Sequence, residues 1–133
     1  MSDSDRTRLI SSLEIVTGVG LLLYWLAFYL VGMAPDNPPS GYFAHANALA
    51  IPECLLGTLL LIAGIFLMMD KPLGWKLSPV AAGALTVVGL VHICFNLQNG
   101  VYLSSEIDLA INAVKDAWCA GFGIALAVMV IRK

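Results

Sequence analysis

Four long apolar stretches, separated by short breaks, constrain this chain more than any other feature; they cover residues 9–33, 42–69, 75–98 and 107–131. Each is longer than the ~20 residues that a helix needs to cross the hydrocarbon core of a bilayer. The breaks are rich in turn formers or charge, and they read APDNPPSG, DKPLG and NGVYLSSE. Because such short connections force neighbouring helices to be antiparallel, the sequence predicts an all-α integral membrane protein with one transmembrane domain, an up-and-down four-helix bundle.

The distribution of charge predicts the orientation of this bundle. Only 12% of the residues are charged, whereas a soluble domain carries about a quarter. Every basic residue except Lys115 flanks an apolar stretch; the six are Arg6, Arg8, Lys71, Lys76, Arg132 and Lys133. The positive-inside rule therefore places both termini in the cytoplasm of a multi-pass protein of the inner or plasma membrane. The net charge of −2 provides no basic surface for nucleic acid.

Polar residues gather on one face of three of the predicted helices. His92, Asn96 and Asn99 are spaced as a helical stripe, and Asn112 and Asp116 belong to a second stripe that runs from residue 108 to residue 119. At 1.5 Å per residue, Glu53, His92, Lys115 and Asp116 fall at one level, in the outer third of the bilayer. Such residues can be interhelical hydrogen-bonding groups, but several ionisable groups at one depth usually mark a functional site.

These residue types suit acid–base chemistry in a pocket that opens to the outer side. We expect Glu53 and Asp116 to be the carboxylates, His92 their acid–base partner, and Lys115 the group that balances charge. Four further side chains are expected to line the substrate site: Trp25, Asn96, Asn99 and Asn112. The predicted substrate is a small lipophilic molecule that comes from the membrane lipid or through the outer mouth. The reaction classes that fit are isomerase, lyase and hydrolase.

Two other sets of residues are expected to have structural roles. Glu14 lies near the cytoplasmic end of the first stretch and is predicted to be an interfacial carboxylate that reaches toward water. Cys54, Cys94 and Cys119 all lie inside apolar stretches and are expected to be packing residues rather than disulfide partners. No HxxH, ExxH or CxxC spacing indicates a metal site.

Two short segments resemble a known family. GYFAHANAL opens the second stretch and GLVHICFNL lies in the third, and both are similar to segments of styrene oxide isomerase, a small four-span membrane enzyme. The resemblance implies haem b with His45 as its axial ligand, and ferric iron that acts as a Lewis acid on an epoxide to yield an aldehyde. The chain departs from the family in the third helix, where His92 and Asn96 stand in place of an asparagine and a tyrosine.

Two functions of other classes remain open. A small proton-coupled transporter or channel would use Glu, His and Asp as a relay, but its path should be polar along its length or have a second polar cluster. The inner half of the stretches is apolar apart from Glu14, which favours an enzyme. An accessory subunit of a larger membrane complex is the third reading. As an enzyme, the protein is expected to be a homo-oligomer.

Overall fold

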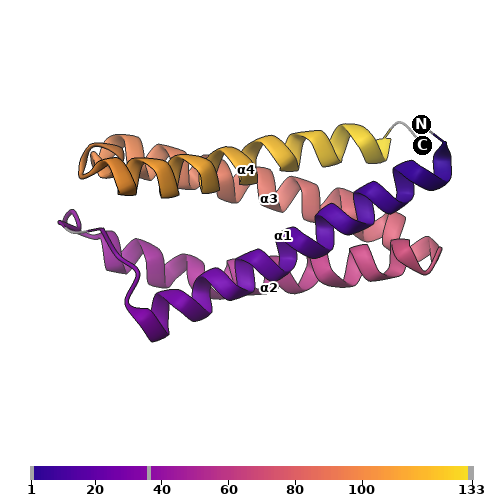
Figure 1. The fold of residues 1–133 in the computed structure, drawn as a ribbon, viewed down its shortest axis with the longest axis horizontal. Helices are drawn as coiled ribbons and strands as arrows, with labels where there is room; N and C mark the ends of the chain where they lie inside the picture. Colours follow the sequence, from indigo (N-terminus) through magenta and orange to yellow (C-terminus); the bar gives the residue numbers. More distant parts are fainter. Residues whose placement is uncertain (1, 36, 132–133) are drawn as a thin grey trace.

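The chain forms four long helices in a computed structural model that describes residues 2–35 and 37–131. They are α1 (Asp3–Val31), α2 (Tyr42–Met68), α3 (Pro72–Gln98) and α4 (Glu106–Ile131), with a short 3₁₀ helix, η1 (Val101–Leu103), before α4 (Figure 1). The described residues contain no strand. All four long helices are long and apolar enough to cross a membrane, which confirms the prediction of four helices of that kind. The largest difference is in α1, which begins at Asp3 instead of residue 9.

Local chemistry explains where α1 begins and ends. Ser2 and Asp5 form a capping box, in which each side chain accepts a hydrogen bond from the backbone N–H of the other residue. This cap satisfies backbone donors of the first turn and extends the helix beyond the apolar stretch. Gly32 then ends α1 in the left-handed conformation, with φ 74°, which glycine adopts without steric cost.

The helices pack as two close pairs, α1 with α2 and α3 with α4, and α2 also packs against α3. Small residues let the backbones of each pair approach closely. A Cβ atom placed on Gly18 of α1 would lie 2.6 Å from the carbonyl oxygen of Gly57 in α2. A Cβ atom on Gly89 of α3 would lie 2.9 Å from the Cα atom of Ala120 in α4. Neither position has room for a side chain, so both crossings depend on glycine.

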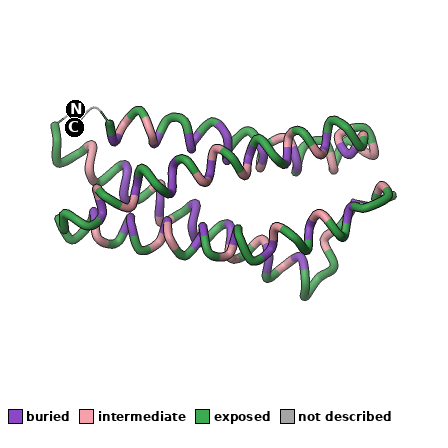
Figure 2. Tube along the Cα trace, turned by 180° about the vertical axis from the view of Figure 1, so that it is seen from behind, coloured by how far each residue is buried: buried purple, intermediate pink, exposed green. Residues whose placement is uncertain are grey.

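The two pairs are in contact at one end of the bundle and diverge at the other (Figures 1 and 2). We call the first the terminal end, where Arg6 of α1 donates a hydrogen bond to the backbone carbonyl of Met129 in α4. Nearer the middle, Trp118 Nε1 in α4 donates to Thr17 Oγ1 in α1 at 3.1 Å. We call the other end the loop end; it carries residues 32–35, 37–41 and 99–105.

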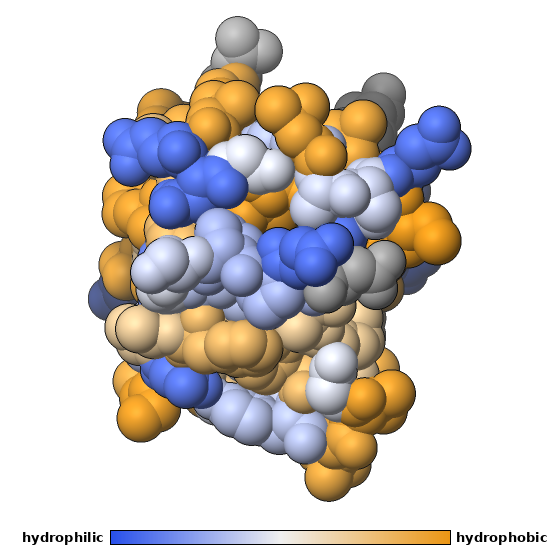
Figure 3. All heavy atoms as spheres, turned by 90° about the vertical axis from the view of Figure 1, so that its left-hand side faces the viewer, coloured by the Kyte–Doolittle hydropathy of each residue, from blue (hydrophilic) through white to orange (hydrophobic). Residues whose placement is uncertain are grey.

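The interior is mainly apolar, and so is much of the outer surface. Leu21, Leu56, Leu60 and Leu85, each at most 5% exposed, form the centre of the bundle. Buried residues recur along the inward faces of the helices in Figure 2. Large apolar side chains point outward from every long helix, as expected for surfaces in contact with lipid. Hydrophilic side chains gather on the loop end, with hydrophobic ones around much of its edge (Figure 3).

Candidate functional site

Three helices contribute to a buried hydrogen-bonded group centred on Glu53. This residue is 1% exposed, and its Oε1 lies 2.5 Å from Nε2 of His92 in α3. Its Oε2 accepts a 3.0 Å hydrogen bond from Nε1 of Trp25 in α1. Because an indole N–H can only donate, Oε2 must be an acceptor. Oε1 and Nε2 are close enough to share one proton, and we refer to these two residues as the Glu53–His92 pair.

A second group is centred on Asp116 of α4, which is also 1% exposed. Its Oδ2 accepts hydrogen bonds from Asn96 Nδ2 at 2.7 Å and from the Tyr102 hydroxyl at 2.6 Å. Its Oδ1 lies 3.7 Å from the Lys115 ammonium nitrogen, which also lies 4.8 Å from the centre of the Tyr24 ring. Two neutral donors and one cation therefore surround this carboxyl group, and its Oδ1 has no hydrogen-bond partner among the described residues.

Helical spacing explains why these polar groups face inward. On α3, Leu85, Gly89, His92 and Asn96 are all buried and recur every three or four residues. Glu53 lies on the buried face of α2 with small and apolar residues at the same spacing. Because His92 and Asn96 are one turn apart, α3 joins the Glu53–His92 pair to the Asp116 group.

A narrow cavity is lined by residues of both groups and shares three of its lining residues with a wider pocket. The cavity measures about 10 Å³ and includes His92, Asn96, Lys115 and Tyr24 in its lining, which is close to the smallest space that holds one water. The pocket measures about 200 Å³ and shares Tyr24, Tyr42 and Asn112 with the cavity.

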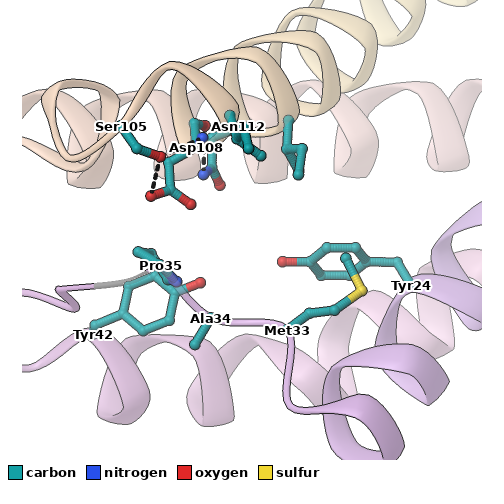
Figure 4. A pocket seen from close by; sticks show the side chains of 10 residues that line it. Tyr24, Met33, Ala34, Pro35, Tyr42, Ser105, Asp108 and Asn112 are labelled. Carbon is teal, nitrogen blue, oxygen red and sulfur yellow. Dashed lines mark hydrogen bonds between the residues drawn. The ribbon is translucent and has the colours of Figure 1, made fainter.

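The pocket lies at the loop end, between the diverging helix pairs. Asp108 and Asn112 of α4 line one side, and Tyr24, Met33 and Tyr42 line the other (Figure 4). The Asp108 carboxylate is held by the Ser105 hydroxyl, which donates to Oδ2 at 2.7 Å. Apolar walls with a few fixed polar groups are typical of sites for small molecules.

His45 lines both the cavity and a second depression. Its ring stacks on Phe95 at a centroid distance of 3.8 Å and meets His92 edge-on at 5.5 Å. The Nε2 atom is buried and has no hydrogen-bond partner among the described residues. His45 also lines a groove of about 400 Å³ whose other walls are mostly apolar, including Val87, Leu90 and Val91. An imidazole nitrogen without a partner, beside an apolar groove, fits the ligand that haem iron requires.

Most of the predicted site residues lie together. Glu53 and His92 are bonded to each other, Asp116 lies with Lys115 and Asn96, and Trp25 and Asn112 line the cavity. Asn99 is an exception. It is exposed, caps the C-terminus of α3, and donates its side-chain N–H to the carbonyl of Phe95. The predicted stripe fails there because α3 ends at Gln98.

Sequence reasoning missed the tyrosines of the site. Tyr102 follows the third span in η1 and folds back over Asp116, which helical spacing could not predict. Tyr24 lies one residue before Trp25, and Tyr42 occupies the first position of α2. Tyr102 lies outside the spans; its burial, followed by its hydrogen bond to Asp116, raises its pKa to about 12.

The prediction for Glu14 is wrong. Its side chain does not reach water but is 0% exposed, between α1, α2 and α3. The position shares a helical stripe with Gly18, Leu21 and Trp25, all of which are buried. That stripe is the signal that could have placed Glu14 in the interior. The terminal half of the bundle therefore contains a buried carboxyl group, which weakens the sequence argument against transport.

In the part of the chain that the structure describes, no three residues of the types His, Cys, Asp and Glu are grouped so as to hold an ion. Comparison of the chain with protein-family models, with curated proteins and with solved structures gave no match.

Proposed function

We propose that this protein is a membrane-embedded isomerase that acts on a small lipophilic substrate, with epoxides as the favoured class. The observation that carries the proposal is the Glu53–His92 pair, with its 2.5 Å contact, buried beside a cavity that is also lined by Asn96 and Lys115 of the Asp116 group. Isomerisation needs a proton donor and a proton acceptor in one water-poor site, with no net consumption of either.

The two groups suit opposite tasks. The Glu53–His92 pair holds a proton that it can give and recover, and Trp25 keeps Glu53 oriented while the proton moves. With an epoxide, this proton goes to the ring oxygen as a C–O bond breaks. A hydride shift between the two carbons then forms the carbonyl, and the oxygen returns the proton to the pair. Asp116 stays ionised and stabilises the transient positive charge.

The polar residues around the cavity would orient the substrate. Asn112 and Tyr24 lie where the pocket meets the cavity, and both can hydrogen-bond an oxygen of the substrate. The apolar walls of the pocket would hold its hydrocarbon part. We place both termini in the cytoplasm of an up-and-down bundle, so that this site faces the outer leaflet.

Haem b is part of the proposal through the resemblance to styrene oxide isomerase. His45 would hold the iron through Nε2, and the groove along Val87, Leu90 and Val91 would accept part of the ring. The bound group would supply Lewis acidity at the substrate oxygen. The residues of this chain would still position the substrate and hold the proton.

The test begins with protein purified gently from membranes. An absorption spectrum with a Soret band that is lost in His45→Ala would support haem binding. Turnover of a panel of lipophilic epoxides to aldehydes would then be followed by gas chromatography. Glu53→Gln and His92→Ala should each reduce turnover by about 10²- to 10⁴-fold, the usual contribution of acid–base catalysis.

Asn96 and Asn99 provide a matched pair of variants on α3. Asn96 is 3% exposed and bonds Asp116, whereas Asn99 is exposed and bonds only its own helix. Asn96→Ala should reduce turnover, and Asn99→Ala should leave it unchanged.

Full activity of folded Glu53→Gln and His92→Ala proteins would refute the acid–base assignment.

A further inference from the structure

Glu14 lies in a second polar site, far from the pocket. Its side chain is 0% exposed, and neither carboxyl oxygen has a hydrogen-bond partner among the described residues. Gly64 of α2 makes room for it, because a Cβ atom there would lie 3.2 Å from the Cβ of Glu14. The nearby serines, Ser11 and Ser78, are also 0% exposed, and each donates its hydroxyl hydrogen to a carbonyl of its own helix.

An ionised carboxylate in these surroundings would be very unfavourable. Moving an unpaired charge out of water carries a large desolvation penalty, which persists even after the surrounding protein relaxes. No Lys, Arg or His in the described ranges lies within ion-pair distance of Glu14. Of the two basic residues nearest in the sequence, Arg6 is hydrogen-bonded to Met129 and Arg8 is exposed. A carboxyl group that cannot be paired in a buried position remains there as the neutral acid.

An apolar layer separates Glu14 from the Glu53–His92 pair. On α1, Leu21 lies between Glu14 and Trp25. On α2, Leu56 and Leu60 lie between Glu53 and Gly64. On α3, Leu85 lies between Ser78 and His92. These four leucines are each at most 5% exposed. The two carboxyl groups therefore occupy separate environments and have no hydrogen-bonded connection in this structure.

We propose that Glu14 is a second proton-binding site, at the terminal end of the bundle, and that it carries its proton at neutral pH. The ligand of this site is a hydrogen ion. Release of the proton requires water or a cation to reach the carboxyl group, and therefore requires α1 to move away from α2 and α3. A bound proton thus stabilises the close packing of the terminal half, independently of chemistry in the pocket.

Infrared difference spectroscopy can detect the neutral acid directly. A protonated carboxyl group gives a carbonyl stretch that is well separated from carboxylate bands and moves slightly in D₂O. The full chain contains three glutamates, Glu14, Glu53 and Glu106. A Glu53→Gln protein labelled with [¹³C]carboxyl-glutamate leaves only Glu14 and the exposed Glu106 as labelled groups. A ¹³C-shifted protonated-acid band in this protein that is lost on Glu14→Gln therefore belongs to Glu14.

The expected result is such a band at neutral pH, and its loss in the doubly substituted protein that also carries Glu14→Gln. The labelled wild-type protein must lose the same band when it carries Glu14→Gln alone, which guards against a rearrangement caused by Glu53→Gln. Absence of the band from folded, labelled protein would overturn the proposal. So would a band that persists after Glu14→Gln. Neither result depends on the proposed isomerase activity.

Discussion

Replacement of Glu53 tests whether its carboxyl group holds α1, α2 and α3 together. Glu53→Leu removes both acceptors and leaves the N–H groups of Trp25 and His92 buried without partners; these residues are 3% and 6% exposed. An unsatisfied buried donor costs about 1–3 kcal/mol, whereas a hydrogen bond in a membrane bundle contributes about 0.6 kcal/mol on average. Because two donors are affected, we expect the free energy of unfolding to fall by about 2–4 kcal/mol.

Glu53→Gln should cost much less, for a specific reason. Trp25 can only donate, so the amide oxygen of the new side chain must face Trp25 and its NH₂ group must face His92. His92 can then accept at Nε2 in its other neutral tautomer. Both contacts survive without a charge, and we expect a loss below about 1 kcal/mol. The two variants therefore separate the structural contribution of Glu53 from its proton chemistry.

The assay is reversible unfolding in mixed micelles, with helix content followed by circular dichroism. A double-mutant cycle with Trp25→Phe isolates the bond to Oε2, and we expect a coupling energy of about 0.5–2 kcal/mol. The reasoning is refuted if Glu53→Leu and Glu53→Gln destabilise the protein equally. It is also refuted if the cycle gives no coupling.

Two further predictions concern other parts of the bundle. Folding raises the pKa of Tyr102 from 10.0 to about 12, so the unfolded chain loses this proton at a lower pH than the folded protein does. The contribution of the protonated Tyr102 hydroxyl to the free energy of unfolding is therefore complete below pH 10 and should disappear as the pH rises to about 12. In an unfolding titration, Tyr102→Phe should flatten this decline in stability. Gly18→Val should destabilise the α1–α2 crossing by about 1–3 kcal/mol because the added Cβ would lie 2.6 Å from the carbonyl oxygen of Gly57. Gly20→Val is the control, since nothing lies within 4 Å of a Cβ placed there, and equal effects on thermal unfolding would contradict the packing argument.

The fold was predictable because hydrocarbon imposes simple rules on a chain. A span must be long, apolar and helical, so hydropathy alone located all four helices. It could not locate the start of α1, because the capping box of Ser2 and Asp5 extends the helix through polar residues. Helical spacing also could not predict that the two pairs diverge at the loop end, since this depends on where small residues permit close contact.

The site was predictable in part, for a related reason. Spacing assigned Glu53, His92 and Asp116 to inward faces, and the structure places them there. Spacing fails where a helix ends, which explains the exposed position of Asn99 and the unforeseen contact of Tyr102. Glu14 was misplaced because its position near the end of a span was given more weight than the stripe it shares with Gly18.

The glycine contacts determine where this protein has room for a pocket. Gly18 against Gly57 and Gly89 against Ala120 bring the backbones of each helix pair so close that no side chain fits between them. The pocket lies between the two pairs instead of inside either one. The separation of the two pairs at the loop end therefore determines the width of the pocket, together with the side chains that line it.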